Sequence, residues 1–131
     1  MISSAPANAA DDYNQAVPGS PPSGMSCYSN SYLDACFKKY GDQLWVRNHS
    51  ASSPAYMQWE NWLYMTNGGW ELYRQGNCTT TQLNVGQWGV CNKDFYENTT
   101  ERWDGTGSML RWRIISGASI SSWGPYYLND Q

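Results

Sequence analysis

The chain has 131 residues, a formal net charge of −3, and eight Trp and ten Tyr against only two Phe. Its length fits one domain, and eight Lys and Arg against eleven Asp and Glu exclude the basic footprint of a nucleic-acid-binding protein. No apolar run approaches the roughly 20 residues of a membrane span. Turn-forming residues recur at short intervals without a sustained helical period. This pattern predicts an all-β fold, an antiparallel sandwich or barrel of about seven or eight strands.

Residues 1–26 indicate an export-signal remnant followed by an extended arm. The first nine residues end in Ala7-Asn8-Ala9, which resembles a signal-peptidase site but lacks the apolar region before it, so a disordered tail is the alternative. Residues 10–26 are rich in Pro and Gly, and we expect them to have no core face. They form either a floppy terminus or a segment that docks into a groove of a partner, with Tyr13 as its large anchor. The residues expected to make that contact are Asp11, Asp12, Tyr13, Asn14 and Val17.

Residues 27–131 form the predicted disulfide-stabilised β domain, which contains Cys27, Cys36, Cys78 and Cys91. Of the three possible pairings we favour Cys27–Cys36 and Cys78–Cys91, because each pair brackets a short segment. Rings of that size contribute roughly 2.5–3 kcal/mol apiece. A zinc site is the rival interpretation, but closely spaced cysteine pairs are missing and the only histidine, His49, lies apart. Disulfides favour an oxidising compartment, hence a secreted, extracellular protein.

Two hairpins are predicted in the first half of this domain, after a short loop or helical turn between Cys27 and Cys36. The first turns at Gly41-Asp42 and sets Phe37 opposite Val46. The second turns at Asn67-Gly68, a strong hairpin signal, and sets Met65 opposite Trp70. In that register one face is a core wall, formed by Met57, Trp59, Leu63, Met65, Trp70 and Leu72. The other face carries Glu60, Trp62, Tyr64, Thr66, Glu71 and Tyr73.

The second half predicts further short strands. Residues 87–91 form one strand, which Cys91 ties back to a loop over residues 77–86. An antiparallel pair follows at 101–103 and 109–114, and in its second strand Leu110, Trp112 and Ile114 alternate with arginines, as in a half-buried strand. Residues 118–123 are expected to give one more strand, and 126–128 an apolar tail.

The aromatic face of the central hairpin is the candidate functional surface. Trp62, Tyr64 and Tyr73 form either the inner layer of a second sheet or an exposed patch for a protein or a sugar ring. Glu60 and Glu71, on the same predicted face, are the one pair of carboxylates that could act as a glycosidase dyad. His49 is expected in an exposed loop. Phosphate-binding loops and calcium motifs are absent from the sequence, and we expect no cofactor and no metal.

Two stretches, residues 36–46 (CFKKYGDQLWV) and 86–95 (GQWGVCNKDF), resemble small secreted actinobacterial proteins with paired cysteines. They are most similar to the adaptor subunit of the antibacterial umbrella toxin particles of Streptomyces. The resemblance implies a non-enzymatic adaptor that links a lectin-type subunit to a scaffold subunit, with its N-terminal arm in a cleft of the lectin-type subunit. The alternatives are a carbohydrate-binding module that uses Trp62, Tyr64 and Tyr73, and a small free-standing toxin or glycoside hydrolase that uses Glu60 and Glu71.

Overall fold

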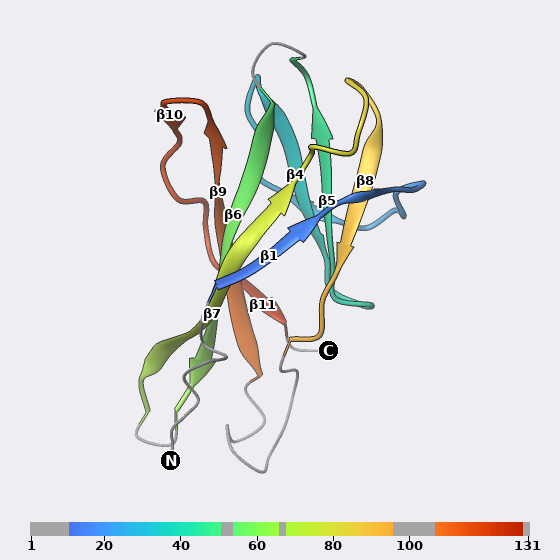
Figure 1. The fold of residues 1–131 in the computed structure, drawn as a ribbon. Coiled ribbons are helices and arrows are strands. Elements are labelled where there is room, and N and C mark those ends of the chain that lie inside the picture. The colour runs from blue at the N-terminus through green and yellow to red at the C-terminus, as the bar shows by residue number, and fades with distance from the viewer. Residues whose placement is uncertain (1–10, 51–53, 66–67, 96–106, 130–131) are drawn as a thin grey trace.

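The structure is a computed structural model that describes residues 11–50, 54–65, 68–95 and 107–129. Two sheets pack face to face without closing into a barrel, and the described residues form strands and no helices (Figure 1). The predicted all-β sandwich is therefore confirmed. Within these ranges no helix is long and apolar enough to cross a membrane.

The strands divide into two sheets, here called sheet A and sheet B. Sheet A has the order β1-β7-β6-β9-β10, with β11 also paired to β9. Its strands are β1 (Asp11–Gln15), β6 (Ala55–Tyr64), β7 (Trp70–Thr79), β9 (Ser108–Ser116), β10 (Ser119–Ile120) and β11 (Tyr127–Asn129). Sheet B has the order β2-β8-β5-β4-β3. Its strands are β2 (Val17–Pro18), β3 (Ser26–Cys27), β4 (Leu33–Lys38), β5 (Gln43–Asn48) and β8 (Trp88–Asn92).

The core lies between the sheets and follows the alternation of the long strands. Burial alternates residue by residue along β6 and through most of β9, as predicted for residues 109–114. Trp59 and Trp112 are fully buried and are the largest side chains of the core. Burying an apolar side chain of this kind contributes about 1.5–3 kcal/mol, so these two strands supply much of the stabilisation.

The β6–β7 hairpin has the predicted register near its base but not near its tip. Asn61 pairs with Arg74, as the prediction requires, but a bulge then shifts the pairing so that Trp62 faces Leu72. The loop is longer than two residues, because the Met65 N–H donates to the Gly69 carbonyl at 2.7 Å. The prediction that Leu72 joins the core wall is therefore wrong: it is 42% exposed and lies on the side of Trp62.

The β4–β5 hairpin also has a different register from the predicted one. Phe37 faces Leu44 rather than Val46, and a four-residue turn over 39–42 replaces the expected two-residue turn. The shift of two residues leaves every side chain on its expected face. The longer turn buries Asp42, whose carboxylate accepts the Phe95 N–H at 3.1 Å. The two stretches that carry the resemblance are therefore neighbours, since β5 also pairs with β8.

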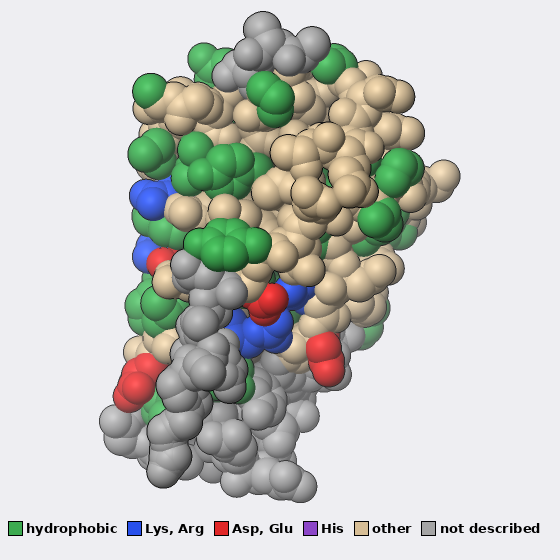
Figure 2. Space-filling model, viewed as in Figure 1, with side chains coloured by type: hydrophobic (Ala, Val, Ile, Leu, Met, Phe, Trp, Pro, Cys, Tyr) green, Lys and Arg blue, Asp and Glu red, His purple; other side chains and the backbone are tan. Residues whose placement is uncertain are grey.

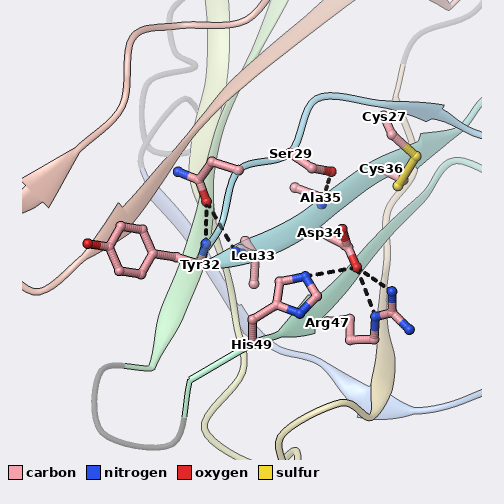
Figure 3. A network of polar contacts seen from close by, with 10 residues as sticks. Cys27, Ser29, Tyr32, Leu33, Asp34, Ala35, Cys36, Arg47 and His49 are labelled. Carbon is pink, nitrogen blue, oxygen red and sulfur yellow. Dashed lines mark hydrogen bonds and ion pairs between the residues drawn. A yellow bond between two sulfur atoms is a disulfide. The ribbon is translucent and has the colours of Figure 1, made fainter.

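Both favoured disulfides are present, and no described cysteine is free, which rules out the zinc interpretation. Cys27 and Cys36 are direct partners on β3 and β4, so the short loop expected between them is the connection of a β-hairpin over residues 28–32, with no helical turn (Figure 3). Cys78 lies in β7 and not in a loop. Its bond to Cys91 of β8 therefore joins sheet A to sheet B.

The N-terminal segment is extended, as predicted, but it pairs with its own domain. Strand β1 runs parallel to β7, and β2 runs antiparallel to β8 (Figure 1). Between them Ala16 is fully buried, so the expectation that this segment has no core face is wrong. Glycines in the neighbouring strands make room for the crossing: a Cβ at Gly76 would overlap the Asp12 backbone, and one at Gly89 would lie 3.0 Å from Ala16.

After β2, residues 19–25 cross the outer face of sheet B to reach β3 at its far edge. We call them the covering segment. The Gly19 N–H donates to the Trp88 carbonyl at 3.1 Å, and Lys38 Nζ donates to the Ser23 carbonyl at 3.0 Å. Gly19 lies against the ring of Trp45, which is only 4% exposed although it points away from the core. The chain therefore covers the part of this face around Trp45 itself.

The predictions for residues 118–128 are partly confirmed. Of the strand expected over 118–123 only β10 forms, and the expected apolar tail forms β11, whose Tyr127 stacks on Trp112 with ring centroids 5.0 Å apart. The export-signal remnant and the strand expected over 101–103 lie outside the described residues.

Candidate functional site

The outer face of sheet A carries a row of polar side chains that runs straight across four strands. The strand pairing aligns Tyr13 of β1 with Asn77 of β7, Asn77 with Gln58 of β6, and Gln58 with Arg113 of β9. Directly paired residues point to the same face of a sheet, so these four side chains share one surface. Gln58 is oriented by its neighbour, because its Oε1 accepts from Arg113 Nε at 2.6 Å.

A second row lies beside the first and is organised by an ion pair. Gln75, Glu60 and Arg111 are aligned on β7, β6 and β9. Glu60 Oε1 accepts from Arg111 Nε at 2.7 Å and from Trp62 Nε1 at 3.0 Å. Both partners of the ion pair are largely buried, with exposed side-chain fractions of 23% for Arg111 and 13% for Glu60. This pairing fixes the carboxylate and the indole in one arrangement.

Aromatic rings gather around the two arginines, and we call this group the arginine–aromatic cluster: Trp62, Arg111, Arg113, Trp123 and Tyr126. The Arg111 guanidinium lies 4.4 Å from the Trp123 ring centroid, 4.9 Å from that of Tyr126 and 5.8 Å from that of Trp62. Arg113 lies 4.5 Å from the Trp123 centroid. Cation–π contacts of this kind hold the segment after β10 against the outer face.

A hollow of about 160 Å³ opens between Tyr13 and Trp123. The residues that line it are Tyr13, Gln58, Trp59, Glu60, Gln75, Gly76, Asn77, Arg113 and Trp123. Most of these carry carboxamide, carboxylate or guanidinium groups, and two aromatic side chains stand at its sides. The hollow therefore offers several hydrogen-bonding groups next to flat apolar surfaces.

Beneath β1, an ion cluster holds the N-terminal strand to the domain. Asp12 pairs with Arg74 and with Lys93, whose Nζ lies 3.2 Å from Asp12 Oδ1 and 2.7 Å from Asn14 Oδ1. Burial opposes the charge on Asp12, but hydrogen bonds from Arg74 and Lys93 outweigh it and lower the pKa of Asp12. Burial lowers the pKa of Lys93, against the opposing effect of Asp12. On the side crossed by β1, Figure 2 shows acidic and basic side chains lying against one another.

The structure separates the predicted arm residues into two groups. Asp12 and Asn14 point between the sheets and are engaged by the ion cluster. Tyr13 points to the outer face of sheet A and is 62% exposed, and Val17 is 49% exposed at the edge of sheet B. Asp11 begins β1 opposite Gln75. Tyr13 is therefore the arm residue that lines the hollow.

The structure places only part of the predicted aromatic face on one surface. Trp62 and Tyr64 lie on the outer face of sheet A, so the alternative that they form the inner layer facing a second sheet is wrong. Tyr64 packs edge-on against Trp70, with centroids 5.2 Å apart. Tyr73 is the extra residue of the bulge.

The same bulge separates the two candidate catalytic carboxylates. Glu71 pairs with Leu63, a buried residue that faces inward, whereas Glu60 faces outward beside Arg111. The expected placement of Glu60 and Glu71 on one face is wrong, since the bulge moves Glu71 to the other side of the hairpin.

His49 is exposed, as expected, but it is not isolated. Its Nε2 lies 3.1 Å from Asp34 Oδ2, and the same oxygen accepts from Arg47 Nε at 2.8 Å (Figure 3). This network belongs to sheet B and lies apart from the hollow.

Several residues of the site were not expected from sequence: Gln58, Gln75, Asn77, Arg111, Arg113, Trp123 and Tyr126. The alternation of Arg111 and Arg113 with buried residues was the one available signal, because it predicts an outward-facing basic pair. The pairing of β9 with β6, which brings that pair to Glu60 and Gln58, has no local signature. Comparison with protein-family models, curated proteins and solved structures finds no match for this chain.

Proposed function

We propose that this protein is a non-enzymatic module that binds another protein through the outer face of sheet A. The observation that carries this proposal is the meeting of two sets of residues from distant parts of the chain. Tyr13 of the N-terminal segment and the arginine–aromatic cluster lie on one face, because β1 pairs with β7 and β9 pairs with β6. The surface therefore combines the arm with the aromatic patch.

The composition of this face supports a protein partner. Protein interfaces are enriched in Trp, Tyr and Arg and depleted in Lys and Glu, and a few such anchors dominate the binding energy. Trp62, Arg111, Trp123 and Tyr126 have this character, and their mutual contacts pre-order them. Pre-ordered side chains lose less conformational entropy when a partner binds.

The contrast between the two sheets supports the same face. The covering segment lies over sheet B and buries Trp45, a large aromatic residue that points outward there. On sheet A, Tyr13 and Tyr126 remain 62% and 43% exposed, whereas Tyr40, which is 67% exposed, lies in the β4–β5 turn and not on a strand of sheet B. Large exposed aromatics that cluster on one side of a small protein mark an interaction surface.

The partner class and the location of the protein are further parts of the proposal. Two disulfides favour a protein that functions in an oxidising compartment, and we propose that it is secreted. The resemblance of residues 36–46 and 86–95 favours an adaptor that links a lectin-type subunit to a scaffold subunit in an antibacterial toxin particle. Those stretches set the β4–β5 hairpin, the inter-sheet disulfide and the Phe95 contact, so the resemblance carries no catalytic role.

The test is quantitative co-purification of the tagged protein secreted by its source organism, with the co-purifying chains identified by mass spectrometry. The wild type is expected to recover lectin-type and scaffold subunits in fixed stoichiometry. Trp62→Ala and Tyr126→Ala remove anchors of the cluster, and each is expected to weaken capture at least about tenfold. Tyr40→Ala, at a 67% exposed position in the β4–β5 turn, is the matched control and keeps full capture.

Thermal unfolding of each variant verifies that the fold is retained. Equal capture by all four proteins, or loss of capture in Tyr40→Ala alone, contradicts the assignment of this face. Recovery of the protein without any stoichiometric partner contradicts the adaptor role itself.

A further inference from the structure

We infer that the hollow on sheet A is a saccharide-binding site that accepts one neutral pyranose ring. The hollow shares Arg113 and Trp123 with the arginine–aromatic cluster, but this inference rests on the groups that line the hollow and not on Trp62 or Tyr126, the anchors tested for partner capture. The lining contains carboxamides, a carboxylate and a guanidinium from three different strands, together with Tyr13 of a fourth strand and Trp123. No single strand could supply this set.

An unsatisfied polar atom on a residue that lines the hollow points to a ligand with hydroxyl groups. Asn77 Oδ1 is buried and accepts no hydrogen bond from the described residues. A buried acceptor without a partner costs about 1–3 kcal/mol, so such an atom calls for a donor. A turn of the Asn77 side chain toward the hollow would allow a sugar hydroxyl to donate to this oxygen.

The neighbours of Asn77 provide the complementary groups. Gln58 pairs with Asn77 across β6 and β7, and Arg113 holds the Gln58 carboxamide by its oxygen. In the adjacent row, Arg111 holds Glu60 by one of its carboxylate oxygens. Each of these side chains is fixed before a ligand arrives, which lowers the entropic cost of binding.

The aromatic side chains of the hollow complete the match to a sugar. A pyranose has an apolar face of C–H groups, against which aromatic rings pack. It also has a polar edge of hydroxyls, to which amides hydrogen-bond. Trp123 is held by Arg111 and Arg113, whose guanidinium groups lie over its ring, so it forms a rigid edge of the hollow. Tyr13 is exposed on the opposite side.

The size and charge of the hollow argue against other ligands. Its volume of about 160 Å³ suits one sugar ring and is too small for a folded peptide segment. Glu60 in the lining disfavours a phosphate or carboxylate ligand, and Arg113 disfavours a simple cation. A neutral polyhydroxylated ring fits both groups.

The test is an NMR titration of the full chain with the methyl glycosides of glucose, galactose, mannose and N-acetylglucosamine. At least one glycoside is expected to bind with a Kd of about 1 mM and to shift the side-chain amide signals of Asn77 and Gln58 and the indole signal of Trp123. Asn77→Leu has a similar volume but no acceptor, and it is expected to weaken binding at least about tenfold. Tyr13→Ala removes an exposed ring and is expected to weaken binding at least about fivefold.

Tyr40→Ala is the matched control, because Tyr40 is an exposed tyrosine in the β4–β5 turn that does not line the hollow, and this variant keeps sugar binding. If no glycoside shifts these signals, or if Asn77→Leu and Tyr13→Ala bind as tightly as the wild type, the saccharide site is refuted. Either result leaves the capture experiment unaffected, so the two proposals fail separately.

Discussion

Individual residues decide whether the N-terminal strand stays on the domain. At Gly76 the backbone of β7 approaches β1 so closely that a Cβ would overlap the carbonyl of Asp12. Gly76→Ala is therefore expected to displace β1 and to lower the free energy of unfolding by about 3 kcal/mol, measured by urea denaturation.

Gly19→Ala is the control for this substitution. Its new Cβ would lie 3.1 Å from the rim of the Trp45 ring, a side chain that can shift by a few tenths of an ångström. The expected cost is below about 1 kcal/mol. Equal costs at the two positions would show that β1 does not pack as described.

The ion cluster under β1 makes stability depend on pH in the acid range. Because the pKa of Asp12 is lower in the folded protein, its contribution is complete above the pKa of the unfolded chain and is lost as the pH falls through the folded pKa. Asp12→Asn is expected to lower Tm at pH 7 and to flatten the decline of Tm toward about pH 2. The lowered pKa of Lys93 makes a constant contribution in the acid range and changes stability with pH only at alkaline pH, so it does not contribute to this slope.

Differential scanning calorimetry of both proteins across this pH range measures the effect. Asp34→Asn, which breaks the ion pairs with Arg47 and His49 on sheet B, is the control for a general loss of one carboxylate. Parallel Tm curves for the wild type and Asp12→Asn would contradict the role given to this cluster.

At the scale of strands and hairpins, the two disulfides connect different parts of the fold. Cys27–Cys36 connects neighbouring strands of one sheet and includes a solvent-exposed cysteine. Cys78–Cys91 connects the two sheets, and both of its cysteines are buried in the core. The short rings are similar in length, so chain entropy alone predicts similar contributions of roughly 2.5–3 kcal/mol.

Removing the inter-sheet bond is expected to cost more than removing the other, because it also empties core volume. The double variant Cys78→Ala/Cys91→Ala should lose about 4 kcal/mol, against about 2.5 kcal/mol for Cys27→Ala/Cys36→Ala. Urea denaturation of the two double variants measures the difference. A larger loss for the Cys27–Cys36 pair would contradict the described positions of the bonds.

The strands were largely predictable from the sequence, because alternation of apolar and polar residues marks their inward faces. The buried residues of β6 and β9, such as Trp59 and Trp112, follow this signal. The turns were less predictable, since the burial of Asp42 and the bulge at Tyr73 depend on contacts from other parts of the chain. These long-range contacts lengthened both hairpin loops beyond what the Gly-containing turns indicate.

The site was only partly predictable, for a related reason. Trp62, Tyr64 and Glu60 were found because they alternate with core residues in one strand. Their partners Arg111 and Gln75 come from other strands, and local sequence does not determine which strands pair. The pairing of β1 with β7 could not be predicted from the sequence either. A segment rich in Pro and Gly has no apolar period, and only the small Ala16 enters the core.

At the scale of the whole molecule, the N-terminal segment links both sheets to the binding surface. It supplies β1 to sheet A, β2 to sheet B and the covering segment to the outer face of sheet B. Deleting it would remove strands as well as a contact residue, so single substitutions on the outer face of sheet A separate binding from folding more cleanly.

The central claim is that the outer face of sheet A is the contact surface and that sheet B is covered by the chain itself. Hydroxyl-radical footprinting of the free protein and of the complex purified from the source culture tests it most directly. We expect Tyr13, Trp62 and Tyr126 to lose reactivity in the complex, while Tyr40 stays as reactive as in the free protein. Protection of Tyr40 with unchanged reactivity at those three residues would contradict the claim.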